Sequence, residues 1–187
     1  MNRLLRTYGL LAFVGGLIIV LDQLSKDWIR ANIALGEIWA PIEALDPFFR
    51  FVHWYNTGVA FGMFQGMNTV FIILAFIVMG VIIFYFPRVP SSDWLLRLAL
   101  CLQLGGAGGN LIDRITLGHV TDFVAVGNFP VFNIADASIS VGVAVLLLGV
   151  WVQDRRERKA AKELPQNELD QESNNEPDPD GEPLRSE

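Results

Sequence analysis

The chain has 187 residues, of which 52% are hydrophobic, and a formal net charge of −6 at pH 7. This charge is uneven, because residues 160–187 hold nine acidic and two basic side chains, whereas residues 1–159 have a net charge of +1. The single cysteine, Cys101, excludes an intrachain disulfide, and with only two histidines, His53 and His119, the chain offers a poor ligand set for zinc.

The first apolar run begins after Arg6 and meets its first charge at Asp22. A signal peptide could begin in the same way, but no cleavage site of small residues follows this run. We therefore predict an uncleaved first membrane span over about residues 7–28.

The following segment is expected to be a loop on the outer side of the membrane. Its residues 36–64 are rich in aromatic and β-branched side chains and are punctuated by glycine and proline. This composition predicts short strands at the membrane–water interface.

Three further apolar stretches predict spans over about residues 68–87, 94–114 and 133–152, each near the ~20 residues that cross a bilayer. A soluble helical bundle would need polar helix faces, and the stretch FIILAFIVMGVIIF has none. The loop at 115–132 is predicted to form a half-turn or an amphipathic segment on the membrane surface. The predicted fold is an all-α polytopic membrane protein with four transmembrane helices and a small β-rich or interfacial element in the first outer loop.

Lysine and arginine residues near the ends of the spans predict the orientation of the chain. They place both termini and the 88–93 loop in the cytoplasm, and the loops at 29–67 and 115–132 outside. The chain is therefore divided into a membrane domain, residues 1–159, and an acidic cytoplasmic tail, residues 160–187, which is predicted to be disordered because it cannot bury a core.

Helical rise places several carboxylates at one depth. Asp22 and Asp113 each lie sixteen residues from an arginine at the predicted cytoplasmic end of their span, and Asp136 lies nineteen residues from another. At ~1.5 Å per residue these separations correspond to about 24 Å and about 28 Å. Asp122 and Asn56, in the outer loops, can reach the same plane. The polar residues should thus meet at the outer edge of the hydrocarbon.

Some of these acids have structural alternatives. Asp22 and Lys26, at i and i+4, could form only an ion pair that anchors the first helix, or Asp22 could belong to a site. Asp113, which shares a helix face with Asn110, could be structural because Arg114 is adjacent. A glycine-rich stretch, GGAGG, precedes Asn110 and would allow another helix to approach closely.

Asp122 and Asp136 have apolar neighbours and no adjacent cation. Ionisable groups inside a membrane usually mark a functional site. Asn133 is placed as the N-cap of the fourth span, with Asp136 in its first turn, where the helix dipole favours a carboxylate. Two carboxylates that lie close together share one proton, as in aspartic proteases, where one acts as a base toward water and the other as an acid.

Two other classes of membrane protein could contain such acids. A proton- or ion-coupled transporter would also place carboxylates in the membrane, but it usually has paired halves, and the sequence shows no internal repeat. A purely structural membrane subunit would leave the unpaired acids unexplained. The residues alone therefore predict a polar site with an acid pair at the outer membrane face, without naming a substrate.

The sequence also resembles the lipoprotein signal peptidase (signal peptidase II) family. The resemblance rests on four blocks in the family's order: LDQLSK at 21–26, NTGVAFG at 56–62, GGAGGNLIDRITLGHVTDF at 105–123 and FNIADASI at 132–139. It implies an intramembrane aspartic endopeptidase of the bacterial cytoplasmic (inner) membrane. Such an enzyme removes signal peptides from diacylglyceryl-modified prolipoproteins by cutting just before the lipidated cysteine. It needs no cofactor and no metal.

Carried over to matching positions, the resemblance implies that Asp122 and Asp136 are catalytic. The residues implied to orient this pair and hold the substrate backbone are Asn56, Asn110, Asp113, Arg114 and Asn133, while Asp22 supports the fold. The expected partners are diacylglyceryl prolipoproteins, membrane lipids and the cyclic peptide inhibitor globomycin. No nucleic-acid partner is expected. The protein is expected to be a monomer. The fourteen residues from Asp122 to Asp136 and the long acidic tail depart from the family's usual pattern.

Overall fold

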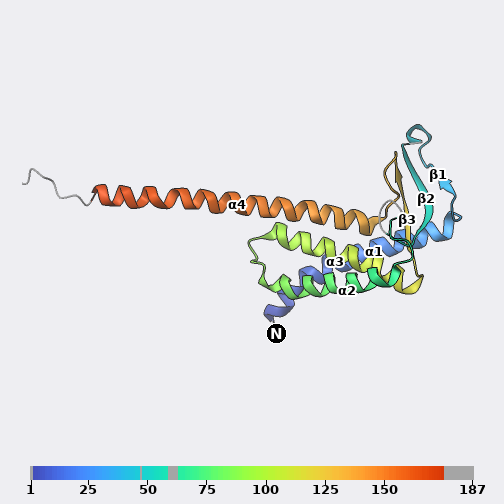
Figure 1. Ribbon diagram of the computed structural model, residues 1–187, viewed down its shortest axis with the longest axis horizontal. Coiled ribbons are helices and arrows are strands. Elements are labelled where there is room, and N and C mark those ends of the chain that lie inside the picture. Colours follow the sequence, from blue (N-terminus) through green and yellow to red (C-terminus); the bar gives the residue numbers. More distant parts are fainter. Residues whose placement is uncertain (1, 47, 59–62, 175–187) are drawn as a thin grey trace, which may run out of the picture. The chain divides into compact units, whose positions relative to one another are not determined.

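A computed structural model of the chain describes residues 2–46, 48–58 and 63–174 (Figure 1). The chain forms two compact units, residues 1–149 and residues 150–187. The elements follow in the order α1 (Asn2–Asn32), β1 (Ile38–Trp39), η1 (Glu43–Leu45), β2 (Phe49–Asn56), α2 (Asn68–Tyr85), η3 (Phe86–Arg88), α3 (Trp94–Thr116), β3 (Val120–Val126) and α4 (Ile134–Asn174).

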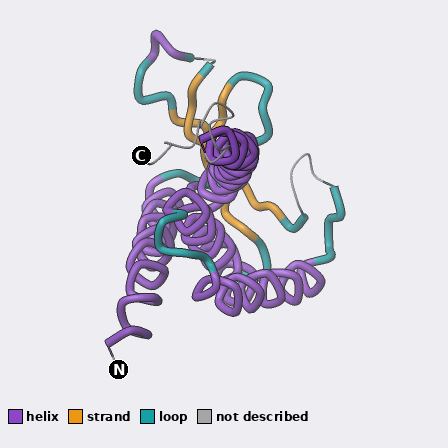
Figure 2. Tube along the Cα trace, turned by 90° about the vertical axis from the view of Figure 1, so that its left-hand side faces the viewer, coloured by secondary structure: helices purple, strands orange, loops and turns teal. Residues whose placement is uncertain are grey.

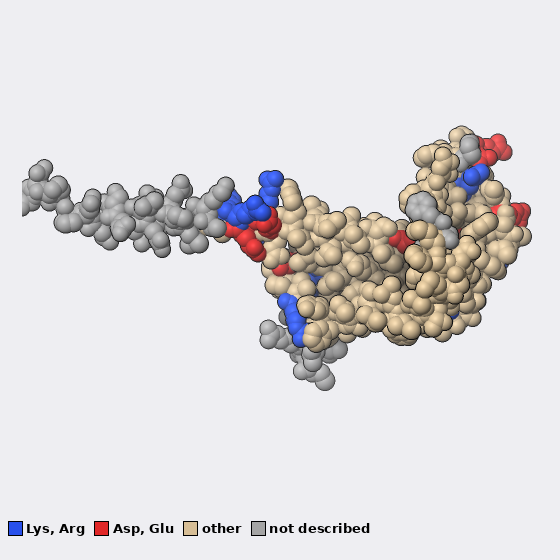
Figure 3. All heavy atoms as spheres, viewed as in Figure 1, with Lys and Arg blue, Asp and Glu red and all other residues tan. Residues whose placement is uncertain are grey.

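Four helical stretches within the described residues are long and apolar enough to cross a membrane, which confirms the prediction of four spans. They are Thr7–Asn32, Asn68–Arg88, Trp94–Thr116 and Ile134–Ala160. The surface over the helices of the first unit is almost free of charged side chains in the view of Figure 3. Most hydrophobic side chains of α2 are exposed, as expected for a helix that faces lipid.

Glycines bring the other helices close to α3, which packs against both α1 and α2. A Cβ at Gly105 would lie 2.7 Å from Ile18 Cβ in α1, and a Cβ at Gly106 would lie 2.5 Å from the carbonyl oxygen of Ala135 in α4. Neither position has space for a side chain. The close approach predicted for the glycine-rich stretch is therefore confirmed, and α3 holds the first turn of α4 beside α1.

The strands form one antiparallel sheet in the order β1-β2-β3. Figure 1 shows this sheet at one end of α1, α2 and α3, and Figure 2 shows its strands in orange. The prediction of short strands in the first loop is confirmed, but the half-turn or amphipathic segment predicted at 115–132 is wrong in part. Residues 120–126, VTDFVAV, form β3 because most of them are β-branched or aromatic, which favours strands, and because they find a partner strand in β2. The register pairs Trp54 with Asp122 and Asn56 with Val120.

An apolar cluster joins the sheet to the helices. Ile29 and Ile33 of α1 are buried against Phe123 of β3, and Phe51 and Ile134 pack around them. Phe123 directly follows Asp122 in β3, so the cluster fixes the strand that holds the Asp122 carboxyl.

Helix α4 continues beyond the span to Asn174, whereas the composition predicted disorder from residue 160. Alanine, lysine, glutamate, glutamine and leucine, which favour helices, make up most of residues 160–172. In the second unit Asp154 and Arg158 form an ion pair at 2.8 Å along the helix. Residues 175–187, the rest of the predicted tail, lie outside the described residues.

Candidate active site

The first turn of α4 is closed by two reciprocal hydrogen bonds. The backbone N–H of Asp136 donates to Asn133 Oδ1 at 2.9 Å, and the backbone N–H of Asn133 donates to Asp136 Oδ2 at 3.3 Å. This arrangement is a capping box, which satisfies free N–H groups at a helix start. The predicted N-cap is confirmed, and the same contacts fix the direction of the Asp136 carboxyl.

Asp122, on β3, is 1% exposed. Asn133 Nδ2 donates to its Oδ1 at 2.7 Å, and Asn56 Nδ2 donates to its Oδ2 at 2.9 Å. Asn56 is held in turn by the backbone N–H of Gly58, which donates to Asn56 Oδ1 at 2.9 Å. Strand pairing between β2 and β3 thus brings an amide from the first loop onto the carboxyl of the second.

Asn110 of α3 links this arrangement to the helices. Its Nδ2 donates to Asp136 Oδ1 at 2.7 Å, and its Oδ1 accepts from Asn133 Nδ2 at 3.1 Å. All four oxygens of Asp122 and Asp136, here called the dyad, therefore accept an N–H. Three asparagines hold the two carboxyls in one connected network.

Burial, and after it the negative charge of Asp136, raise the pKa of Asp122 to about 7. The hydrogen bonds from Asn56 and Asn133 favour the ionised form and oppose this shift. Near neutral pH the dyad can therefore hold a proton that an isolated aspartate would have lost.

An ion cluster of three fully buried residues lies beside the dyad. Lys26 Nζ lies 2.8 Å from Asp22 Oδ2 and 3.2 Å from Asp113 Oδ2, and all three side chains are 0% exposed. Lys26 also donates to Asn110 Oδ1 at 3.0 Å. The i,i+4 ion pair expected as one alternative for Asp22 is confirmed, but it is shared with α3 and does not face the membrane surface.

Asp22 and Asp113 also tie the other elements together. Asp22 Oδ1 accepts the backbone N–H of Ala135, in the first turn of α4, at 2.9 Å. Asp113 Oδ2 accepts the backbone N–H of Thr121, in β3, at 3.0 Å. Each acid therefore satisfies a backbone donor next to a member of the dyad.

The sequence reasoning missed four residues of this network: Gln23, Lys26 as its centre, Arg30 and Thr121. Positions 22, 26 and 30 are four residues apart, so they form a polar stripe along one face of α1. That stripe is the signal that could have identified a polar helix–helix contact. The network contains seven of the eight predicted site residues: Asp22, Asn56, Asn110, Asp113, Asp122, Asn133 and Asp136.

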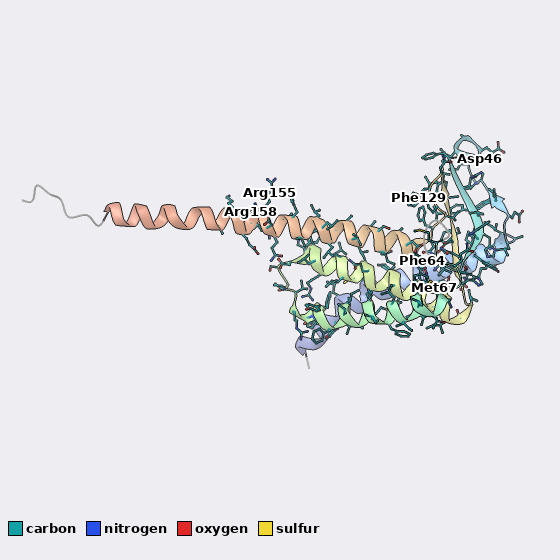
Figure 4. The ribbon with its side chains drawn as sticks, in the orientation of Figure 1. Asp46, Phe64, Met67, Phe129, Arg155 and Arg158 are labelled. Carbon is teal, nitrogen blue, oxygen red and sulfur yellow. The ribbon has the colours of Figure 1, made fainter. Side chains whose placement is uncertain are left out.

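A cavity of about 480 Å³ opens beside the network. Asp136, Asn110 and Asn56 form its polar part, and residues 129–132 contribute an apolar wall. Figure 4 shows Phe129 beside the strands at the end of the helices. Asp136 lines this cavity, whereas Asp122 is not one of its lining residues.

Arg114, the eighth predicted residue, lines the same cavity. Its Nη2 donates to the carbonyl oxygen of Gly58 at 3.3 Å, and its guanidinium carbon lies 5.3 Å from the ring centre of Phe71. Arg114 thus positions the backbone that follows β2 and supplies a positive charge at the cavity wall.

The profile of the Signal peptidase (SPase) II family matches residues 14–152, which include every residue of the network and the cavity. The chain belongs to the signal peptidase II family. Lipoprotein signal peptidases are 39% identical over 154 residues in Shouchella clausii, covering 81% of this chain and 100% of the relative, and 38% identical over 157 residues in Bacillus pumilus, covering 82% and 97%.

Two solved structures of bacterial membrane enzymes are also similar to this signal peptidase II chain. One has a TM-score of 0.73 and 27% identity, covering 78% of this chain and 90% of the other. The second has a TM-score of 0.68 and 28% identity, covering 76% and 92%. The chain is therefore a multi-pass membrane protease of the signal peptidase II family.

Proposed function

We propose that this signal peptidase II is an aspartic endopeptidase in which Asp122 and Asp136 are the catalytic pair. The observation that carries the proposal is that three asparagines hold the buried Asp122 carboxyl and the half-buried Asp136 carboxyl in one network, and that Asp136 lines a cavity with an apolar wall. A shared proton is what an aspartic mechanism requires, and the raised pKa of Asp122 supports it.

In the proposed reaction the ionised carboxylate takes a proton from water, and the water oxygen bonds to the scissile carbonyl carbon. The protonated carboxyl gives its proton to the carbonyl oxygen, which yields a neutral tetrahedral intermediate. When the C–N bond breaks, the amine nitrogen receives a proton from one carboxyl, and a hydroxyl of the intermediate returns a proton to the other. The pair ends with one proton, as it began.

The proposed substrate is a diacylglyceryl prolipoprotein, cut immediately before the lipidated cysteine. The cavity combines a polar end with an apolar wall that includes Phe129, Phe132 and Val141. Such a wall suits a peptide whose acyl chains stay in the bilayer. Since the site lies at the end of the helices, the substrate can enter from the lipid while water reaches the carboxyls from outside.

We further propose that the protein lies in the bacterial cytoplasmic membrane, with both termini in the cytoplasm and the dyad at the periplasmic face. The basic residues Arg88, Arg155, Arg156 and Arg158 support this orientation, because positive charge is retained on the cytoplasmic side. Membrane lipids would surround the protein, which we expect to act as a monomer. The same cavity would bind globomycin, the inhibitor expected from the resemblance.

A cleavage assay with purified protein in lipid nanodiscs tests the proposed function. A synthetic prolipoprotein with a diacylglyceryl cysteine should be cut, and mass spectrometry should place the new N-terminus at that cysteine. The same peptide without the lipid should be cut at least ~10-fold more slowly. Equal cleavage of both peptides, or cleavage at another bond, would contradict the proposed substrate.

A further inference from the structure

Lys26 is the one cation in the buried ion cluster, and it is fully removed from solvent. Its ammonium has three protons and three partners: Asp22 Oδ2 at 2.8 Å, Asp113 Oδ2 at 3.2 Å and Asn110 Oδ1 at 3.0 Å. Two carboxylates are enough to compensate the charge. The third contact, to a neutral amide, points toward the dyad and needs a separate explanation.

The ammonium determines which way the Asn110 amide faces. A lysine ammonium can only donate hydrogen bonds, so the Asn110 atom next to it must be the carbonyl oxygen. Asn133 Nδ2 donates to the same oxygen at 3.1 Å. The NH₂ group of Asn110 must then face Asp136 Oδ1, which it contacts at 2.7 Å. The reverse orientation would set an NH₂ group against an ammonium and a carbonyl oxygen against a carboxylate.

The other two asparagines of the site are held differently. The carbonyl oxygen of Asn133 accepts the backbone N–H of Asp136, and that of Asn56 accepts the backbone N–H of Gly58. Only Asn110 has its carbonyl oxygen held by a charged side chain. Lys26, a residue that can be replaced without changing the backbone, therefore holds the orientation of this amide together with Asn133.

Two features favour the charge on Asp136 over Asp122. Asp136 lies in the first turn of α4, where the helix dipole stabilises a negative charge, and it lines the cavity. Asp122 is 1% exposed and is not one of the lining residues. The NH₂ group of Asn110 adds a donor that stabilises the ionised form and cannot accept a proton.

We propose that Lys26 is a positioning residue for the dyad: it fixes the amide of Asn110 so that Asp136 stays the ionised, proton-accepting member, and Asp122 holds the shared proton. This inference rests on the proposed function. The charged groups that surround Asn110 and the dyad are Asp22, Lys26, Arg30, Asp113 and Arg114. Among these described groups, Lys26 is the one that binds both carboxylates of the ion cluster and also donates to an asparagine amide that contacts the dyad.

The test uses an Asp113→Asn background, because Lys26→Met alone would leave two buried carboxylates with only Arg30, 3.7 Å from Asp113 Oδ1, as a compensating cation. The double variant Lys26→Met/Asp113→Asn keeps the wild-type net charge of the cluster, −1. Asp113→Asn, in which the cluster is neutral, is the control for the lost Asp113 carboxylate. A hydrogen bond to a charged group corresponds to roughly 10- to 100-fold in rate. We expect kcat to fall by about that factor relative to Asp113→Asn, with KM within about twofold. We also expect the acidic limb of the pH–rate profile to move to higher pH, because the base loses its donor.

A double-mutant cycle then separates positioning from folding. In an Asn110→Ala background the Lys26→Met change should cost less than about twofold in kcat, because the amide through which it acts is gone. Lys26→Gln/Asp113→Asn provides a second variant of nearly the same size, whose amide can pair with Asn110 in either orientation. A lysine needed only for folding would lower Tm and leave kcat and the pH profile of the folded protein unchanged in both double variants.

The failures of the two proposals can be told apart. If Asp122→Asn or Asp136→Asn still cleaves, the proposed function is wrong. If both are inactive while the Lys26 variants keep the kcat and pH profile of Asp113→Asn, the positioning role is wrong. The positioning role is also wrong if the losses in kcat caused by the Lys26 and Asn110 substitutions multiply when the two are combined.

Discussion

Gly109 of α3 lies directly against the carboxylate of Asp22 in α1: a Cβ at Gly109 would be 2.5 Å from Asp22 Oδ2 and 3.3 Å from Ala135 Cβ in α4. Three helices thus meet where only a hydrogen atom fits. The carboxylate at this point also binds Lys26 and the first turn of α4. A small change in side-chain volume should therefore disturb the whole network.

The first prediction follows from this contact. Gly109→Ala should destabilise the detergent-extracted protein by about 1–3 kcal/mol, because the added methyl group displaces Asp22 from Lys26. Cleavage activity should fall with it. Gly80→Ala in α2 is the control, since no neighbouring atom lies within 4 Å of a Cβ there. Thermal unfolding of both variants measures the difference, and an equal Tm for the two would contradict the prediction.

The second prediction concerns the dyad. Asp122→Asn and Asp136→Asn should each abolish cleavage while the protein still accumulates in the membrane, because asparagine keeps the shape but cannot cycle a proton. The double variant should be little worse than either single one, since residues that act in one step are not additive. Asp113→Asn should instead lower Tm and keep measurable activity. An inactive but stable Asp113→Asn beside an active Asp122→Asn would identify a different pair.

The third prediction concerns the pH dependence of stability. The pKa of Asp122 is raised to about 7 in the folded protein. Its contribution to stability is therefore complete below pH ~4, the usual pKa of an aspartate, and is lost as pH rises toward 7. The change is on the order of 4 kcal/mol at most. Wild type should therefore lose more stability between pH 5 and pH 8 than Asp122→Asn, measured as Tm in detergent.

The effect of His119 on the pH dependence of stability is opposite to that of Asp122, and the two effects must be separated. Burial lowers its pKa, so its contribution is lost as pH falls below the usual range of a histidine. The comparison between wild type and Asp122→Asn cancels the His119 effect, because both proteins contain it. Identical pH dependence in the two would show that Asp122 has an ordinary pKa.

The fourth prediction concerns topology. Reporter fusions after Lys159 and between Arg88 and Asp93 should be cytoplasmic, and fusions near Glu43 and Gly127 should be periplasmic. The physical reason is the distribution of lysine and arginine at the ends of the spans. A cytoplasmic reporter at Gly127 would place Asp122 on the wrong side for the proposed reaction.

The fifth prediction concerns the acidic tail. Truncation after Lys159 should leave membrane insertion and cleavage within about twofold of wild type, because, among the residues that the structure describes, the network and the cavity contain none beyond Val141. Protein amount in the membrane and cleavage rate per molecule measure this. A large loss of activity at a normal protein level would assign the tail a role.

Much of this site could be predicted from local signals. Four apolar stretches of the right length identified the spans, and the absence of a neighbouring cation singled out Asp122 and Asp136. Strand β3 could not be identified securely, because its partner, β2, lies more than sixty residues earlier in the chain. The centre of the ion cluster was missed for the same reason. The sequence indicates the pairing of Lys26 with Asp22, because the two are one helical turn apart. The contacts of Lys26 with Asp113 and Asn110 exist only once α1 and α3 pack.

The pairing of Asp22 with Lys26 inside a single helix also bears on biosynthesis. A ribosome delivers α1 to the bilayer long before α3, and a lone lysine in that helix would be costly to insert. With its counter-ion one turn away, α1 enters as a nearly neutral segment. Asp113 and Asp122 are synthesised later, and Asp136 comes last, at the start of α4. The carboxyl pair is therefore completed only when the final span is inserted, so a nascent chain is assembled before it can cleave anything.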